Sequence, residues 1–325
     1  LVPGCTRKEQ ILESLRTILL IAKAAFLEAL RPGFHAVLLL TGIALIAVSP
    51  VLSAFALGDE NSLLIDISLS SMLAVGVFLG AFTAASSLGD EIRRRTIMVL
   101  LSKPIPRWSL ILGKFLGITL ALSLAQISWM ATLLLAIRHR TIHSRLQVDE
   151  TPVLLLAFCG LSLSLIFAAW KHRQGHSFPA NLSKSCSLLL GISAVIAISQ
   201  NPSGDWISPL RIVEPSVFAA MIMVHLTVLI LAAVALTAST RLPTPATLAV
   251  TLGTLMSGVI VGSIGRDYSW VRMFPDLQRL WISDGLIRGG SVSPEALGWA
   301  MLWTALVISA ILSLGVALFA RRDVG

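Results

Sequence analysis

Long apolar runs separated by short polar intervals fill the chain from residue 34 to residue 320. A helix rises about 1.5 Å per residue, so about 20 apolar residues cross the hydrocarbon core of a bilayer. Six runs meet that length: 34–57, 63–88, 110–137, 219–240, 246–265 and 298–320. Two shorter runs that are richer in Ser and Gly, 153–170 and 182–199, lie between the third and the fourth, and we expect both to span. The pattern predicts an all-α polytopic membrane protein with six core transmembrane helices and two inserted ones.

The segment before the first run has a different pattern. Residues 8–31 mix apolar side chains such as Leu15 and Leu19 with charged ones such as Glu13 and Lys23. A helix with such mixed faces is expected to lie along a membrane surface; the alternative is a helix packed on its own protein. We therefore divide the chain into an N-terminal interfacial helix, residues 1–33, and a transmembrane domain, residues 34–325.

Composition supports a membrane protein and narrows its partners. Hydrophobic residues make up 55% of the chain and charged residues 13%, whereas about a quarter of a soluble domain is charged. The net charge of +8 comes from short basic clusters beside apolar runs and not from one stripe, so membrane lipid is the expected partner and nucleic acid is not. The three cysteines have no metal-ligand spacing, so neither a metal site nor a disulfide framework is expected.

The distribution of Lys and Arg predicts the orientation. Basic residues gather between the second and third runs and again at Arg321 and Arg322, and both groups should be cytoplasmic. An even number of crossings then places both termini in the cytoplasm. One cluster does not fit, because Arg138, Arg140 and Arg145 follow the third run and fall on the outside.

The segment after the second run carries the most specific pattern, "GDEIRRRTIMVLLSKPIPRWSLILGK". Asp90 can cap a short helix, and Pro104 should end it near Ser102. One face of this helix holds Ile92, Thr96, Val99 and Leu100, and the other holds Glu91, Arg94, Arg95 and Ser102. The pattern predicts an amphipathic cytoplasmic helix of about three turns, joined to two spans and able to transmit force between them.

This segment closely resembles the signature of the ABC-2 type transporter permeases, the membrane subunits of a class of ABC transporters. The matching positions are Glu91, Thr96, Ser102, Pro104, Arg107, Gly113 and Lys114. The sequence departs from the family at Arg95, where glycine is usual. The resemblance covers most of the chain except residues 138–218, where the two shorter runs look like an insertion.

The resemblance implies a permease subunit of a bacterial-type cytoplasmic membrane, driven by a separate cytoplasmic ATPase that grips the helix after the second span. A second permease chain, identical or different, would complete the assembly. The implied ATPase contacts are Asp90, Glu91, Arg93, Arg94, Arg95, Thr96, Pro104 and Arg107, with Lys114 as a snorkelling membrane anchor. The sequence contains no GxxxxGK[ST] phosphate loop, so we expect no ATP site, no cofactor and no enzymatic activity in this chain.

Polar residues within the spans are few. Gln126 and His225 are candidate transport-pathway residues, although hydrogen bonds between helices are the favoured interpretation of both. An ion-coupled secondary transporter is an alternative if His225 and Asp66 form a relay. A force-transmitting assembly of the same architecture that transports nothing is the other alternative.

Overall fold

The computed structural model describes residues 7–55, 60–89, 106–143, 153–200, 205–208, 213–264, 276–281 and 292–320. These residues are almost entirely helical and form no β-strand; Gln200 and Trp206 make one isolated bridge. The helices are α1 (Arg7–Leu30), α2 (Gly33–Ser53), α3 (Glu60–Ala84), α6 (Arg107–His143), α7 (Val153–Arg173), α8 (Phe178–Ile198), α9 (Pro215–Ser239), α10 (Thr244–Ile264) and α12 (Pro294–Ala320). Two short elements accompany them, the π-helical turn η1 (Ala85–Gly89) and the 3₁₀ turn η4 (Leu277–Leu280).

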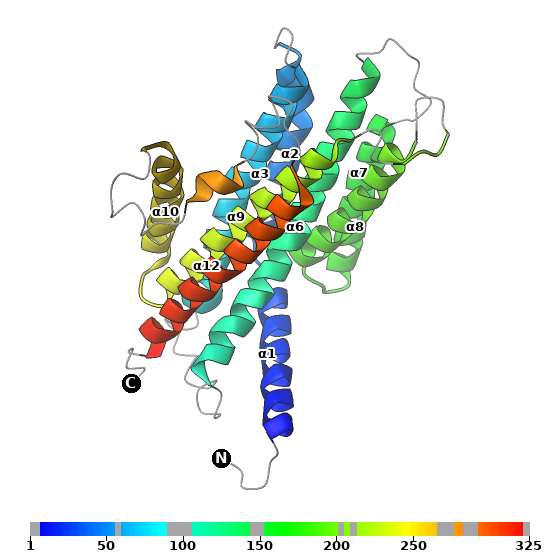
Figure 1. The fold of residues 1–325 in the computed structure, drawn as a ribbon. Helices are drawn as coiled ribbons and strands as arrows, with labels where there is room; N and C mark the ends of the chain where they lie inside the picture. The colour runs from blue at the N-terminus through cyan, green and yellow to red at the C-terminus, as the bar shows by residue number, and fades with distance from the viewer. Residues whose placement is uncertain are drawn as a thin grey trace.

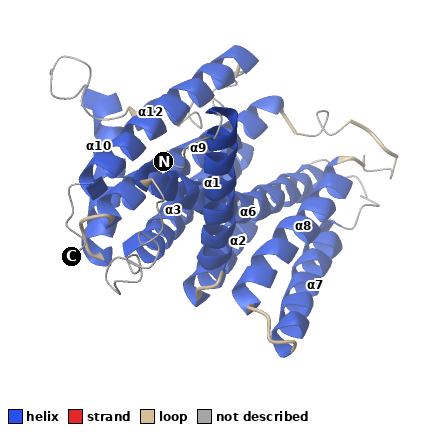
Figure 2. Ribbon diagram, turned by 90° about the horizontal axis from the view of Figure 1, so that it is seen from below, coloured by secondary structure: helices blue, strands red, loops and turns tan. Residues whose placement is uncertain are grey.

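Eight helices within the described part are long and apolar enough to cross a membrane, which confirms an all-α polytopic architecture. Each predicted span falls on one of them. The two shorter runs form α7 and α8, which are joined by a tight turn and lie together on one side of the bundle, whereas α10 and α12 lie on the other (Figure 2).

The centre of the bundle is formed by α3, α6 and α9, which pack on one another and on α2, α12 and α10 (Figure 1). Trp129 of α6 is 1% exposed, and its indole N–H donates to the carbonyl of Leu39 in α2 at 3.0 Å. Gly42 provides the space for this ring, because a Cβ there would lie 2.3 Å from the indole nitrogen. The buried indole N–H of Trp129 thus finds a hydrogen-bond acceptor in a backbone carbonyl of α2.

Small residues set the closest helix contacts. A Cβ on Gly76 or Gly80 of α3 would meet side chains of α9, at 2.8 Å from Val228 and 3.4 Å from Ala232. Without a hydrophobic driving force between helices in lipid, such close packing is a main source of helix association.

Helix α1 packs against the first half of α6 and extends below the other helices in Figure 1. Its buried face consists of Ile18, Ala22, Ala25 and Ala29. Leu15, Leu19 and Leu20 are more than half exposed on its other side. The structure therefore shows the alternative in which this helix packs on its own protein; its placement along a membrane surface stays a prediction.

One end of the bundle gathers several chain segments that are distant in sequence. The start of α1, the end of α3, the start of α6 and the end of α12 all lie at the lower end in Figure 1. The two described residues that border the segment 90–105 lie at the end of η1 and directly before the start of α6. The even number of candidate spans brings the first and last described residues, Arg7 and Ala320, to one side of the bundle.

Replacing Gly117 with alanine should loosen α1 from α6. The new Cβ would lie 2.6 Å from the Ala22 carbonyl oxygen and 2.7 Å from the Phe26 backbone nitrogen, and backbone atoms cannot move aside cheaply. We expect a loss of about 1–3 kcal/mol in the free energy of unfolding, measured by reversible denaturation in mixed micelles. Gly253→Ala is the control, because nothing lies within 4 Å of its Cβ. Equal stability of the two variants would contradict this account of the α1–α6 contact.

Candidate functional site

The candidate site consists of the residues on either side of segment 90–105, where α3 ends and α6 begins. Seven of the residues implied as ATPase contacts lie outside the described residues: Asp90, Glu91, Arg93, Arg94, Arg95, Thr96 and Pro104. Arg107 and Lys114, which follow this segment, are described. The site can therefore be built from the two points where residues 90–105 join the bundle.

Both junctions are ordered by local hydrogen bonds and burial. At the first, α3 passes into the π turn η1, in which Ser87, Leu88 and Gly89 are buried. Such turns interrupt the regular helix ladder and recur at functional sites. At the second, the backbone N–H and the hydroxyl of Ser109 donate to the Pro106 carbonyl at 3.0 and 2.7 Å, which fixes the first turn of α6.

Lys114 joins these two junctions to each other and to α1. Its ammonium donates to the Ser87 carbonyl at 2.5 Å and to the Ser87 hydroxyl at 3.2 Å. It also lies 3.4 Å from a carboxylate oxygen of Glu28, near the end of α1. The ammonium of Lys114 thus joins three elements, α1, η1 and α6. We call Lys114 with its partners Ser87 and Glu28 the lysine clamp.

The Ser87 carbonyl is the stronger of these partners. The side chain of Glu28 is 46% exposed, and a pair open to water contributes at most about 1 kcal/mol. Lys114 itself is 3% exposed, so its ammonium needs compensation from buried groups. A charged hydrogen bond to a carbonyl at a helix C-terminus, where the helix dipole is negative, provides it, at about 1.5–3 kcal/mol.

The sequence predicts that Lys114 is a snorkelling membrane anchor, and that role stays a prediction. A snorkelling lysine extends its ammonium to the lipid headgroups. In this structure Lys114 is 3% exposed, and its ammonium donates to the carbonyl of Ser87.

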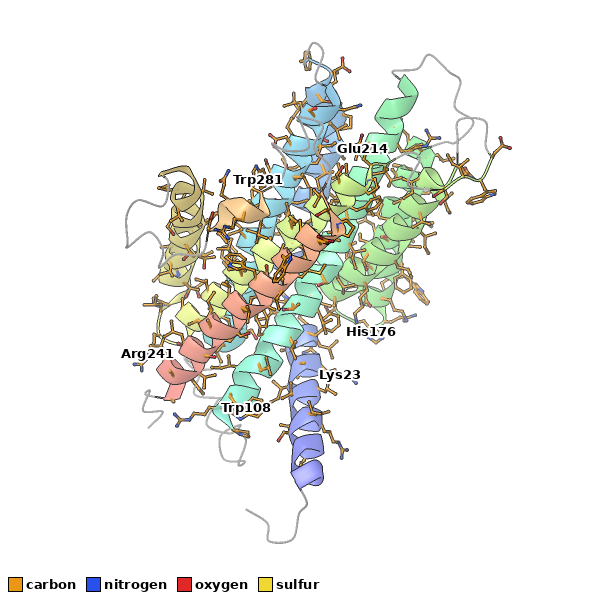
Figure 3. The ribbon with its side chains drawn as sticks, in the orientation of Figure 1. Lys23, Trp108, His176, Glu214, Arg241 and Trp281 are labelled. Carbon is orange, nitrogen blue, oxygen red and sulfur yellow. The ribbon has the colours of Figure 1, made fainter. Side chains whose placement is uncertain are left out.

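Arg107 and a second arginine, Arg241, hold the end of α12. Arg107 donates to the Ala320 carbonyl at 2.6 Å, and its guanidinium lies 5.7 Å from the ring centre of Phe319. Arg241, in the connection between α9 and α10, donates to the Leu318 carbonyl at 2.8 Å. It is labelled at the lower left of Figure 3, beside the last turn of α12. The final carbonyls of a helix lack intrahelical partners, and the two arginines supply them.

Arg138 explains part of the basic cluster that did not fit the orientation rule. It is 2% exposed and donates to the carbonyls of Ala197 and Gln200 at 3.0 and 3.1 Å, at the C-terminal end of α8. Arg138 is therefore a structural residue buried in the protein and not a cation of an exposed loop, to which the orientation rule applies. The side chains of Arg140 and Arg145 lie outside those the structure describes.

The two candidate pathway residues make contacts between helices. His225 Nε2 lies 3.1 Å from the hydroxyl of Ser123, whose oxygen is also 2.8 Å from the Thr119 carbonyl oxygen. The amide nitrogen of Gln126 lies 3.7 Å from the sulfur of Met72. These contacts fit the favoured interpretation of helix-to-helix bonds, and a role for either residue in transport stays a prediction.

Among the apolar grooves that open between the described helices are the following two. One, of about 390 Å³, lies between α3, α9, α10 and η4 and includes Leu73, Thr227, Met256 and Trp281. The other, of about 280 Å³, lies between α2, α6, α7 and α8. Neither Gln126 nor His225 lines either groove.

No protein-family model and no curated protein matches the chain. The site is therefore interpreted from its own geometry and from the sequence of residues 90–114.

Ser87 and Arg241 could not be recognised as site residues from the sequence, and neither could the bond of Lys114 to the Ser87 carbonyl. No local signal marks either residue, because each has its partner in a helix that is distant in the sequence.

Replacing Lys114 with methionine should destabilise the lower end of the bundle. Methionine keeps the length of the side chain but leaves the buried Ser87 carbonyl without this donor, which costs about 1–3 kcal/mol in the free energy of unfolding. The control is Lys23→Met on the exposed side of α1, where a change within about 0.5 kcal/mol is expected. If both variants unfold at the same denaturant concentration as the parent, Lys114 is not a clamp.

Replacing Arg138 with methionine should loosen the end of α8. Two charge-assisted hydrogen bonds are lost, so local opening becomes easier by about 2–3 kcal/mol. Hydrogen exchange followed by mass spectrometry should show faster exchange near Ala197 and unchanged exchange near Ser183. The exposed Arg16→Met serves as the control; uniform acceleration along α8 in the Arg138 variant would argue against a local cap.

Proposed function

We propose that the chain is the transmembrane permease subunit of an ABC-2 type ABC transporter. A separate cytoplasmic ATPase subunit hydrolyses ATP, and this chain converts the motion of that subunit into movement of a substrate across the cytoplasmic membrane. The ATPase binds the segment of residues 90–107, and a second permease chain completes the pathway.

The lysine clamp is the observation that carries this proposal. A segment that receives force from a partner must pass it to the spans on both sides, and a loose connection would absorb it. Lys114 bonds the last turn before residue 90 to the second turn of the helix that begins at Arg107. A displacement of residues 90–105 would therefore move the lower ends of α3 and α6 together.

Other contacts extend this linkage. Glu28 connects α1 to the clamp, and Arg107 connects the start of α6 to the end of α12. Because α12 also packs on α9, where Thr237 donates to the Ile311 carbonyl at 3.1 Å, the motion would reach the far side of the bundle. Packed helices respond to such a displacement by tilting as units, which is the motion a transport cycle requires.

The composition of the spans supports an ATP-driven mechanism over an ion-coupled one. A proton-coupled carrier needs ionisable groups that face one another within the membrane. The described partner of His225 is Ser123, a neutral hydroxyl, and Asp66 on α3 forms no hydrogen bond or ion pair within the described residues.

The proposal is tested by co-purification of the chain with the ATPase encoded beside it. Glu91→Lys should abolish binding and the permease-dependent part of ATP turnover, because it reverses the charge of a residue in the implied contact. Glu295→Lys is the matched control, an exposed charge reversal at the start of α12 and hence at the opposite end of the bundle. Undiminished binding by the Glu91 variant would sink the assignment of this contact.

Reconstitution in vesicles separates the alternatives. Transport that requires ATP and survives collapse of the proton gradient supports the permease. Transport without ATP that stops with the gradient would favour a secondary carrier, and ATP turnover without transport would favour a force-transmitting assembly.

A further inference from the structure

The turn between α7 and α8 has no role in the proposed function, yet hydrogen bonds fix its backbone and basic residues surround it. Gly175 has a φ of +84°, and the backbone N–H groups of Gly175 and His176 donate to the carbonyls of His172 and Lys171 at 3.0 and 3.1 Å. This pair of bonds is a Schellman motif, which ends a helix with a left-handed residue. Only two residues later, the Ser177 hydroxyl accepts the backbone N–H of Ala180 at 3.3 Å and caps α8.

The turn presents positive charge that has no acidic counterpart nearby in sequence. Lys171, His172, Arg173 and His176 occupy the last turn of α7 and the residues after it, and no Asp or Glu occurs between Glu150 and Asp205. Arg173 is exposed and makes no hydrogen bond or ion pair within the described residues. On the neighbouring α1, the carboxylate of Glu28 already faces Lys114. We call Lys171, His172, Arg173 and His176 the basic turn.

Aromatic and apolar side chains continue from the basic turn along α7. The Lys171 ammonium lies 5.0 Å from the ring centre of Trp170 and 5.9 Å from that of Phe167. Trp170 is 53% exposed, and farther along the helix Ile166 and Phe158 are 64% and 70% exposed. An exposed tryptophan between a basic group and an apolar face is the arrangement found at the boundary between headgroups and acyl chains.

The depth of the basic turn agrees with this boundary. His35, in the first turn of α2, lies 3.2 Å from the Ser183 hydroxyl, in the second turn of α8. The basic turn therefore lies level with the break between α1 and α2, where the first span begins. His176 is labelled at the lower end of the hairpin in Figure 3, and the apolar face of α7 extends upward from it.

We infer that the basic turn binds the phosphate of an anionic phospholipid, with Arg173 and Lys171 at the headgroup, Trp170 at the glycerol level and the acyl chains along the exposed face of α7. This site is independent of the ATPase contact. The lipid would bind the hairpin of α7 and α8, and the proposed contact at residues 90–107 does not depend on it.

The test uses the fluorescence of Trp170, which phospholipids with brominated acyl chains quench on contact. The chain has eight tryptophans, so the signal of Trp170 is the difference between the parent and Trp170→Phe. In mixed micelles, brominated phosphatidylglycerol should quench this component at a lower mole fraction than brominated phosphatidylcholine. Lys171→Gln with Arg173→Gln should reduce this preference roughly tenfold, because each basic residue near an anionic surface strengthens the binding of anionic lipid. Arg16→Gln with Lys23→Gln, two exposed basic residues on α1, should leave it unchanged.

The parent protein alone keeps the proposal falsifiable if the double variant fails to fold. Equal quenching of Trp170 by the two lipids in the unaltered chain would overturn it, as would an unchanged preference in a folded double variant. Loss of the preference in the α1 control would also overturn it, because it would show that total charge and not this site selects the lipid. Competition by soluble glycerol phosphate would assign the site to free phosphate and not to lipid.

Discussion

Cations that donate hydrogen bonds to the last carbonyls of helices hold this bundle together where apolar packing stops. The last carbonyls of a helix have no partner within it, and in lipid or protein they have no water to bind. Lys114 supplies a donor to the end of α3, Arg138 to the end of α8, and Arg107 and Arg241 to the end of α12. At Lys114 and Arg138, which are 3% and 2% exposed, the contact cancels two costs at once, because a buried cation also needs a negative partner in a medium of low dielectric constant.

These contacts differ in kind from the close packing at the centre. There, glycines and alanines allow α3, α6 and α9 to approach, and dispersion forces act over many atoms without direction. At the ends, a few directional bonds decide which helix termini move as a group. The lower end is joined by Lys114, Arg107 and Arg241, and at the upper end Arg138 bonds α6 to the end of α8.

The spans could be predicted from the sequence because their signal is local. Twenty apolar residues in a row need no knowledge of the rest of the chain, and even the shorter runs of α7 and α8 were recognisable. The partners of these cations could not be predicted in the same way. Ser87 is 27 positions from Lys114, and Leu318 is 77 positions from Arg241. Nothing near Lys114 in the sequence distinguishes a lysine that turns inward from one that extends to the headgroups.

The same limit explains the misfit of Arg138. Counting basic residues beside spans treats every arginine as a free surface charge, but Arg138 is bound to carbonyls of another helix. The packing of α1 was also undetermined, because a helix with mixed faces suits a membrane surface and a protein surface equally. Its close contact with α6 depends on Gly117, about 90 positions away, and the sequence does not show that these two helices meet.

The spacing of the buried cations along α6 has a consequence for the membrane itself. Lys114 and Arg138 are 24 positions apart on one continuous helix, which corresponds to about 36 Å. This exceeds the average hydrocarbon thickness of about 30 Å by only a few ångströms, and mismatch of this size is relieved by tilting the helix or deforming the bilayer. Because α6 carries the lysine clamp, a thinner bilayer that tilts it would also reorient the base of residues 90–105. Lipid thickness would then act on the same mechanical linkage as the proposed ATPase, from within the membrane.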